Sequence, residues 1–167
     1  MKLTTVWGIL PVISLKSKDS WGHAKGPLIW LPENHTKALY RHELFHVKQW
    51  YAESAVFLAG SALVYTAAKL AADSFPALVA NVWAITILVA LVVGICFSKW
   101  TNSKRQHFRR ETAAYGESLR NMPSTYVNAQ AMHYARTLAT SDRYGLNVST
   151  DEALQRIKDR FEDGRLF

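Results

Sequence analysis

The polar and apolar positions of the chain fall into three stretches of different character. Residues 1–52 mix apolar residues with turn formers such as Gly8 and Pro11. Residues 53–100 carry almost no charge, whereas residues 101–167 are polar, charged and mostly helical in pattern. We therefore predict that the first and third stretches form one domain and that the second forms an inserted helical hairpin.

The first stretch predicts short strands followed by a helix. Residues 1–15 have a strand-forming pattern, and Leu28–Leu31 is a short apolar run bounded by prolines, which suits the edge of a sheet. Asn34-His35-Thr36 carries helix-start signals, and residues 38–50 contain no proline or glycine. A helix is therefore expected to begin near Thr36.

The second stretch predicts two membrane-spanning helices. Residues 77–98 have no ionisable side chain except the thiol of Cys96, and residues 54–72 have only Lys69, near their end. About twenty such residues, at roughly 1.5 Å each, span a hydrocarbon core of about 30 Å. With Asp73–Pro76 as the turn, we expect a transmembrane hairpin in a lipid bilayer. The alternative is a hairpin that a protein partner buries.

Basic residues flank this hairpin and predict its orientation. Three precede the first span and five follow the second: Lys37, Arg41, Lys48, Lys99, Lys104, Arg105, Arg109 and Arg110. By the positive-inside rule, both termini face the cytoplasm. The same clustering accounts for much of the formal net charge of +7, and no recognition motif for nucleic acid accompanies it. We therefore expect an integral membrane protein that binds no nucleic acid.

The strongest chemical signal is the motif that runs from His42 to His46. Residues four apart share one face of a helix, so His42 and His46 present two imidazoles toward one point. Such a pair can bind a divalent metal such as zinc, and Glu43 beside it is suited to act as a general base. The single cysteine excludes a thiolate zinc cluster and a disulfide framework.

A catalytic zinc usually takes three protein ligands, so a third residue is needed. Glu111 is the best candidate, because the second helix of the hairpin returns the chain toward the two histidines. We expect residues 101–103 to bend or break this returning helix. His107 and Glu117 are rival ligands.

The order of these features resembles the HtpX-like and CAAX-prenyl-protease family of integral membrane zinc metallopeptidases. Residues 41–48 are similar to the metal-binding helix of that family, and residues 110–115 to the helix that supplies its third ligand. The family commonly has an aspartate four residues after the ligand glutamate, where this chain has Tyr115. The resemblance covers about residues 27–119, and a minimal gluzincin with a membrane insertion fits nearly as well.

The resemblance implies a site and a reaction. His42, His46 and Glu111 would hold one zinc ion, and Glu43 would be the general base in the hydrolysis of a peptide bond. An extended peptide or protein substrate would pair with the strand at 28–31 by β-addition.

A group that stabilises the transition state is also expected. The first candidate is Tyr115, one turn beyond Glu111. Three other residues are alternatives: Tyr126, His133 and Arg143.

The last stretch predicts further helices, one from about Pro123 to Ala139 and one after a capping box at 149–152. We therefore predict an α+β fold, predominantly helical: a minimal zincin-like domain with a transmembrane hairpin inserted between the two ligand-bearing helices. The predicted function is a membrane-anchored zinc endopeptidase, alone or in an oligomer or larger membrane assembly. The alternative is a membrane-associated structural or assembly protein, for example of a virus, that retains the fold without essential proteolysis.

Overall fold

The structure is a computed structural model, and it describes most of the chain as two compact units. The described residues are 1–18, 21–74, 79–120, 122–140 and 145–163. One unit combines residues 1–51 with 104–167, and the other is formed by residues 52–103. Both ligand-bearing segments predicted from the sequence belong to the first unit.

A four-stranded sheet forms the N-terminal part of the first unit. Its strands are β1 (Lys2–Val6), β2 (Leu10–Lys16), β3 (His23–Lys25) and β4 (Leu28–Leu31), in the order β1-β2-β4-β3. β2 pairs antiparallel with β1 and parallel with β4, and β3 pairs antiparallel with β4. The strand-forming character predicted for the N-terminus is confirmed. The prediction that β4 is an edge strand is wrong, because β2 and β3 pair with its two sides.

Helix α1 (Lys37–Ser74) follows the sheet and begins where the sequence predicted. The backbone N–H of Leu39 donates to Oγ1 of Thr36 at 3.1 Å, and that of Tyr40 donates to the Thr36 carbonyl oxygen at 3.1 Å. Thr36 therefore satisfies donors that a helix leaves free in its first turn.

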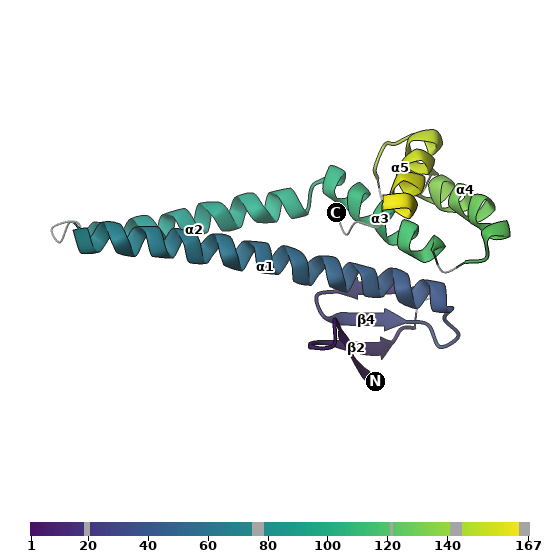
Figure 1. The fold of residues 1–167 in the computed structure, drawn as a ribbon, viewed down its shortest axis with the longest axis horizontal. Coiled ribbons are helices and arrows are strands. Elements are labelled where there is room, and N and C mark those ends of the chain that lie inside the picture. The colour runs from purple at the N-terminus through teal and green to yellow at the C-terminus, as the bar shows by residue number, and fades with distance from the viewer. Residues whose placement is uncertain (19–20, 75–78, 121, 141–144, 164–167) are drawn as a thin grey trace. The chain divides into compact units, whose positions relative to one another are not determined.

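The first half of α1 packs one face on the sheet. Its apolar side chains on this face recur at helical spacing: Tyr40, Leu44, Val47 and Tyr51. They contact a sheet core that includes Val12, Ile29 and Leu31. Within the first unit, Figure 1 shows this part of α1 between the sheet and the helices α3, α4 and α5.

After α1, the described residues form four further helices: α2 (Val79–Thr101), α3 (Lys104–Leu119), α4 (Ser124–Thr140) and α5 (Thr150–Asp163). The break predicted near residues 101–103 is confirmed, because α2 ends at Thr101 and α3 begins at Lys104. Both predicted C-terminal helices are present, and the backbone N–H of Glu152 donates to Oγ of Ser149 at 3.1 Å.

Helix α3 is held firmly against α5. A Cβ placed on Gly116 would lie 2.9 Å from Cβ of Arg160 and 3.0 Å from the backbone nitrogen of Phe161, so only glycine permits this approach. The Arg120 guanidinium donates from Nε to the Phe161 carbonyl at 2.9 Å and from Nη2 to that of Arg160. These contacts fix the helix that carries Glu111.

The predicted transmembrane hairpin is wrong, and with it the predicted integral membrane location, orientation and membrane-inserted fold class. Among the described residues, none of the helices combines the length and the apolar character that crossing a membrane requires. The segment 54–72 contains one charged residue, Lys69, and seven of its nineteen residues are alanine, which is less apolar than leucine, isoleucine or valine.

The predicted turn at Asp73–Pro76 falls partly outside the described residues. Helix α1 ends at Ser74, and residues 75–78 are not described. The chain has an α+β fold. Its second unit contains the later part of α1 together with α2.

Candidate metal centre

Three side chains predicted as ligands lie together in the first unit. Nε2 of His42 is 3.2 Å from Nε2 of His46 and 3.4 Å from Oε2 of Glu111. Nε2 of His46 is 3.5 Å from Oε1 of Glu111. The two imidazoles come from α1 and the carboxylate from α3, so the fold joins residues that are distant in sequence.

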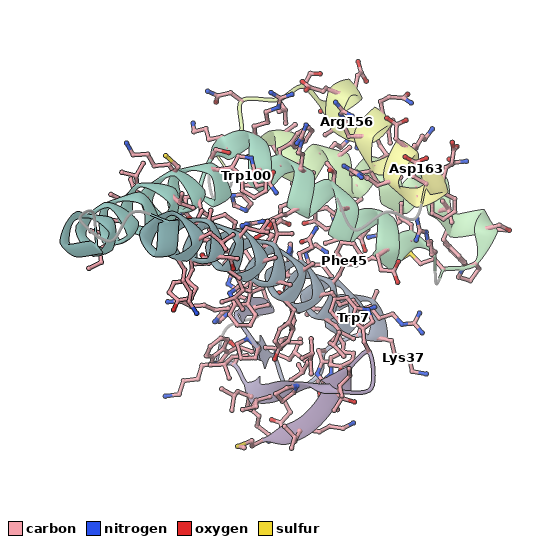
Figure 2. All side chains as sticks on the ribbon, turned by 60° about the vertical axis from the view of Figure 1, so that its left-hand side comes forward. Trp7, Lys37, Phe45, Trp100, Arg156 and Asp163 are labelled. Atoms are coloured by element: carbon pink, nitrogen blue, oxygen red, sulfur yellow. The ribbon has the colours of Figure 1, made fainter. Side chains whose placement is uncertain are left out.

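Small side chains let the two ligand-bearing helices approach. Phe45, between the two histidines in sequence, packs against Ala113 and Ala114 of α3 in a small buried cluster. Phe45 is labelled in Figure 2, which shows it on the side of α1 that faces the C-terminal helices. Because both partners on α3 are alanines, the α3 backbone comes close enough for Glu111 to reach the imidazoles.

Glu111 is buried, yet it is held as a carboxylate. Burial alone would raise its pKa, but His46 nearby and the hydrogen bonds from three imidazoles, His107, His42 and His46, hold the pKa of Glu111 well below its usual value. The same pairing, led by Glu111, raises the pKa of His46 despite the opposing effect of burial. The Glu111 carboxylate therefore supplies the negative charge with which the imidazoles pair.

The outer nitrogen of His46 has a partner that fixes its tautomer. Nδ1–H of His46 donates to Oε1 of Gln49 at 3.1 Å, and Gln49 is almost fully buried one turn further along α1. When the imidazole of His46 is neutral, Nε2 therefore carries the lone pair, on the side of the ring that lies next to His42 and Glu111. Such an outer hydrogen bond is the usual means of orienting a metal-binding imidazole.

His42 is oriented by packing instead. Its ring lies 4.5 Å, centroid to centroid, from the ring of Tyr115, which itself stacks on Tyr134 at 4.2 Å. Nδ1 of His42 is buried and has no hydrogen-bond partner among the described residues. Tyr115 thus contacts the ring of His42 at the position where the resembling family has an aspartate.

Glu43 lies buried beside the imidazoles and under Gly22. Burial raises the pKa of Glu43, and His42 and His46 offset part of that rise. A Cβ on Gly22 would lie 3.0 Å from Cγ and 3.1 Å from Oε1 of Glu43, and 3.2 Å from Cδ2 of Leu31. Sequence reasoning missed Gly22, and its only signal was a glycine just before a short strand.

The three groups fit a divalent metal ion. Two neutral imidazole lone pairs 3.2 Å apart repel each other unless a cation or a shared proton lies between them. Oε2 of Glu111 is buried, and its contact with Nε2 of His42, at 3.4 Å, is long for a hydrogen bond. Ligands about 2.0–2.1 Å from a tetrahedral zinc are about 3.3–3.4 Å apart, and the three separations are 3.2–3.5 Å.

The rival ligands and the other candidate residues are placed differently. His107 reaches Oε1 of Glu111 at 3.3 Å, so it contacts the cluster, whereas Glu117 pairs with Arg120 at 3.2 Å. Tyr126 is exposed on α4, and the His133 ring lies 6.0 Å from that of Tyr134. Arg143 lies outside the described residues.

Comparisons of the chain with models of protein families, with curated proteins and with solved structures find no match.

Proposed function

We propose that the protein is a zinc-dependent endopeptidase. The proposal rests on one observation above all: two imidazoles and a carboxylate converge from separate segments, with a buried second carboxylate, Glu43, next to them. A site with three protein ligands and an adjacent buried base is typical of catalytic rather than structural zinc. Two imidazoles and a carboxylate also accept other divalent ions, so zinc is the first metal to test.

Each residue has a defined task in this proposal. His42, His46 and Glu111 would hold the ion, which supplies acidification of a water molecule and polarisation of the scissile carbonyl. Glu43 takes a proton from the attacking water and returns it to the leaving amine. Its raised pKa suits this exchange, because a carboxylate with a higher pKa is a stronger base.

The substrate would bind at a different strand from the one predicted. β4 is covered on both sides, whereas β3 is the last strand of the described sheet on that side. Gly22, which immediately precedes β3, faces Glu43. An extended peptide added to the outer side of β3 would therefore run beside the base, and its backbone would supply the pairing hydrogen bonds.

The test is the substitution Glu43→Gln in the full chain. It should lower kcat for peptide hydrolysis by about 10²–10⁴-fold, the usual contribution of a general acid–base group. Zinc content, measured by atomic absorption, should stay at one ion per chain, because Glu43 is not a ligand. Glu117→Gln is the matched control, since Glu117 pairs with Arg120 away from the cluster, and it should keep full activity.

Two results count against the proposal. Unchanged hydrolysis by Glu43→Gln would remove the assigned base. A zinc-loaded wild-type protein that cleaves no member of a broad peptide set would favour the alternative, a structural or assembly protein that keeps the metal for its fold.

A further inference from the structure

The side chains on the face of α3 that bears Glu111 become more exposed toward the beginning of the helix. The exposed fraction of the side chains rises from 10% at Glu111 to 44% at His107, one turn earlier. Lys104, a further turn back, is exposed. Lys104, His107 and Glu111 share one face of the helix, because they are spaced by three and four residues. A molecule that approaches the cluster along α3 passes Lys104 and then His107.

This approach is positively charged, and within the part of the chain that the structure describes no acidic side chain pairs with its cations. Among the described residues, the side chains of Lys104, Arg105 and Arg109 have no hydrogen-bond or ion-pair partner. The acidic residues of α3 are engaged elsewhere: Glu111 with the imidazoles and Glu117 with Arg120. Lys104 and Arg105 also do not stabilise the helix, because they lie in its first turn, where positive charge opposes the helix dipole.

We propose that Lys104 is a specificity-determining residue that binds an acidic side chain of the peptide substrate, so that acidic peptides are the preferred substrate class. This inference rests on the proposed peptidase function. Lys104 is the cation on the face of α3 that also bears Glu111, whereas Arg105 is turned about 120° away around the helix. His107 lines the path between Lys104 and the cluster.

The spacing predicts where the acidic residue lies in the substrate. From Glu111 to Lys104 is seven residues, or about 10 Å along the helix. An extended peptide covers this length in about three residues. The recognised Glu or Asp is therefore expected about three residues from the scissile bond, on the side of the bond that runs toward the beginning of α3.

The experiment is a set of fluorogenic peptides of one common sequence. A single Glu is moved through the three positions on either side of the scissile bond, and each peptide has a Gln twin. The wild-type protein should cleave the best Glu peptide with a kcat/KM about fivefold above its twin, the size expected of an exposed charge pair. The difference should lie in KM and should shrink in high salt, because the charges are exposed.

Variants then assign the preference to one side chain. Lys104→Gln should abolish it, and Lys104→Glu should reverse it. Arg105→Gln removes the same charge one residue along and should leave it intact. A second readout is binding of fluorescently labelled Glu and Gln peptides to metal-free Glu43→Gln protein by anisotropy, where the same fivefold preference in Kd should depend on Lys104.

The outcomes separate this inference from the proposed function. Hydrolysis with no preference for Glu at any position, or with a preference that survives in Lys104→Gln, overturns the role of Lys104 and leaves the peptidase standing. If no peptide is cleaved, the peptidase proposal fails, and the anisotropy measurement still decides whether Lys104 selects acidic peptides.

Discussion

The two faces of the first half of α1 differ in polarity. The face on the sheet is apolar, with Val47 packed against Ile29 and Leu31. The face toward α3 buries His42, Gln49 and other polar groups. Apolar burial stabilises a fold without geometric precision, whereas buried polar groups cost free energy unless each finds a partner. The sheet face of α1 therefore contributes stability through apolar burial, and the α3 face contributes the polar groups of the site.

The largest effect on the site is expected from replacing Glu111, the proposed third ligand. Glu111→Ala should weaken zinc binding by more than the roughly 100-fold that the loss of an outer hydrogen bond causes, because it removes a direct ligand. A chelator competition assay measures the change. Glu117→Ala is the control on the same helix and should keep the wild-type affinity, because its carboxylate pairs with Arg120. Equal zinc loss in both variants would place the metal elsewhere.

On the sheet face of α1 we expect the reverse: a substitution should lower stability and leave zinc binding unchanged. Ile29 is fully buried in the sheet core, so Ile29→Ala should lower the free energy of unfolding by about 2–5 kcal/mol. The protein that remains folded should bind zinc at wild-type stoichiometry. Leu3→Ala, at an exposed position of the same sheet, should change the unfolding free energy by less than about 0.5 kcal/mol in urea denaturation. Loss of zinc from folded Ile29→Ala protein would show that the two faces are coupled.

An intermediate effect is expected from removing the hydrogen bond that orients His46. Gln49→Leu keeps the volume of the side chain and removes the acceptor of Nδ1–H. We expect zinc affinity to fall by about 10–100-fold, the usual cost of losing such a partner. Competition with a chelator measures the affinity, and circular dichroism checks that the helix content is unchanged. Wild-type affinity in a folded Gln49→Leu protein would mean that packing alone orients the imidazole of His46.

Local features of the fold were predictable because their causes are local. The start of α1 follows from a side-chain cap at Thr36, and the break before Lys104 follows from residues 101–103, which favour turns. His42 and His46 share a face because of helix geometry. That Glu111 lies beside them is now an observation, while its role as a ligand stays a prediction.

The errors concern long-range pairing and hydropathy. Nothing in the residues of β4 distinguishes an edge from an inner strand, because the three-residue strand β3 that covers it has almost no pattern of its own. The membrane prediction equated the near lack of charge in 54–72 with strongly apolar character, although seven of the nineteen residues there are alanine. The role of Gly22 depends on a contact with Glu43 that only the tertiary structure specifies.

The smallest effect is expected at Gly22, where the sheet contacts Glu43. Gly22 immediately precedes β3 and lies against Glu43. Its φ is not in the left-handed region, so glycine is needed here because a side chain would not fit, not because of the backbone conformation. Gly22→Ala would place a methyl group 3.0–3.1 Å from Glu43 and displace that carboxylate. Because a misplacement of about 1 Å can cost 10²-fold in rate, a smaller shift should lower kcat by roughly tenfold, with zinc affinity unchanged.

Steady-state kinetics with a cleavable peptide measures this change, and Gly60→Ala is its control. Gly60 lies within helix α1 and has no left-handed φ, and a Cβ there has open space within 4 Å, so activity should not change and stability should rise slightly. A Gly22→Ala protein with wild-type kcat would show that Glu43 tolerates displacement. In that case the sheet would support the site without setting the position of its base.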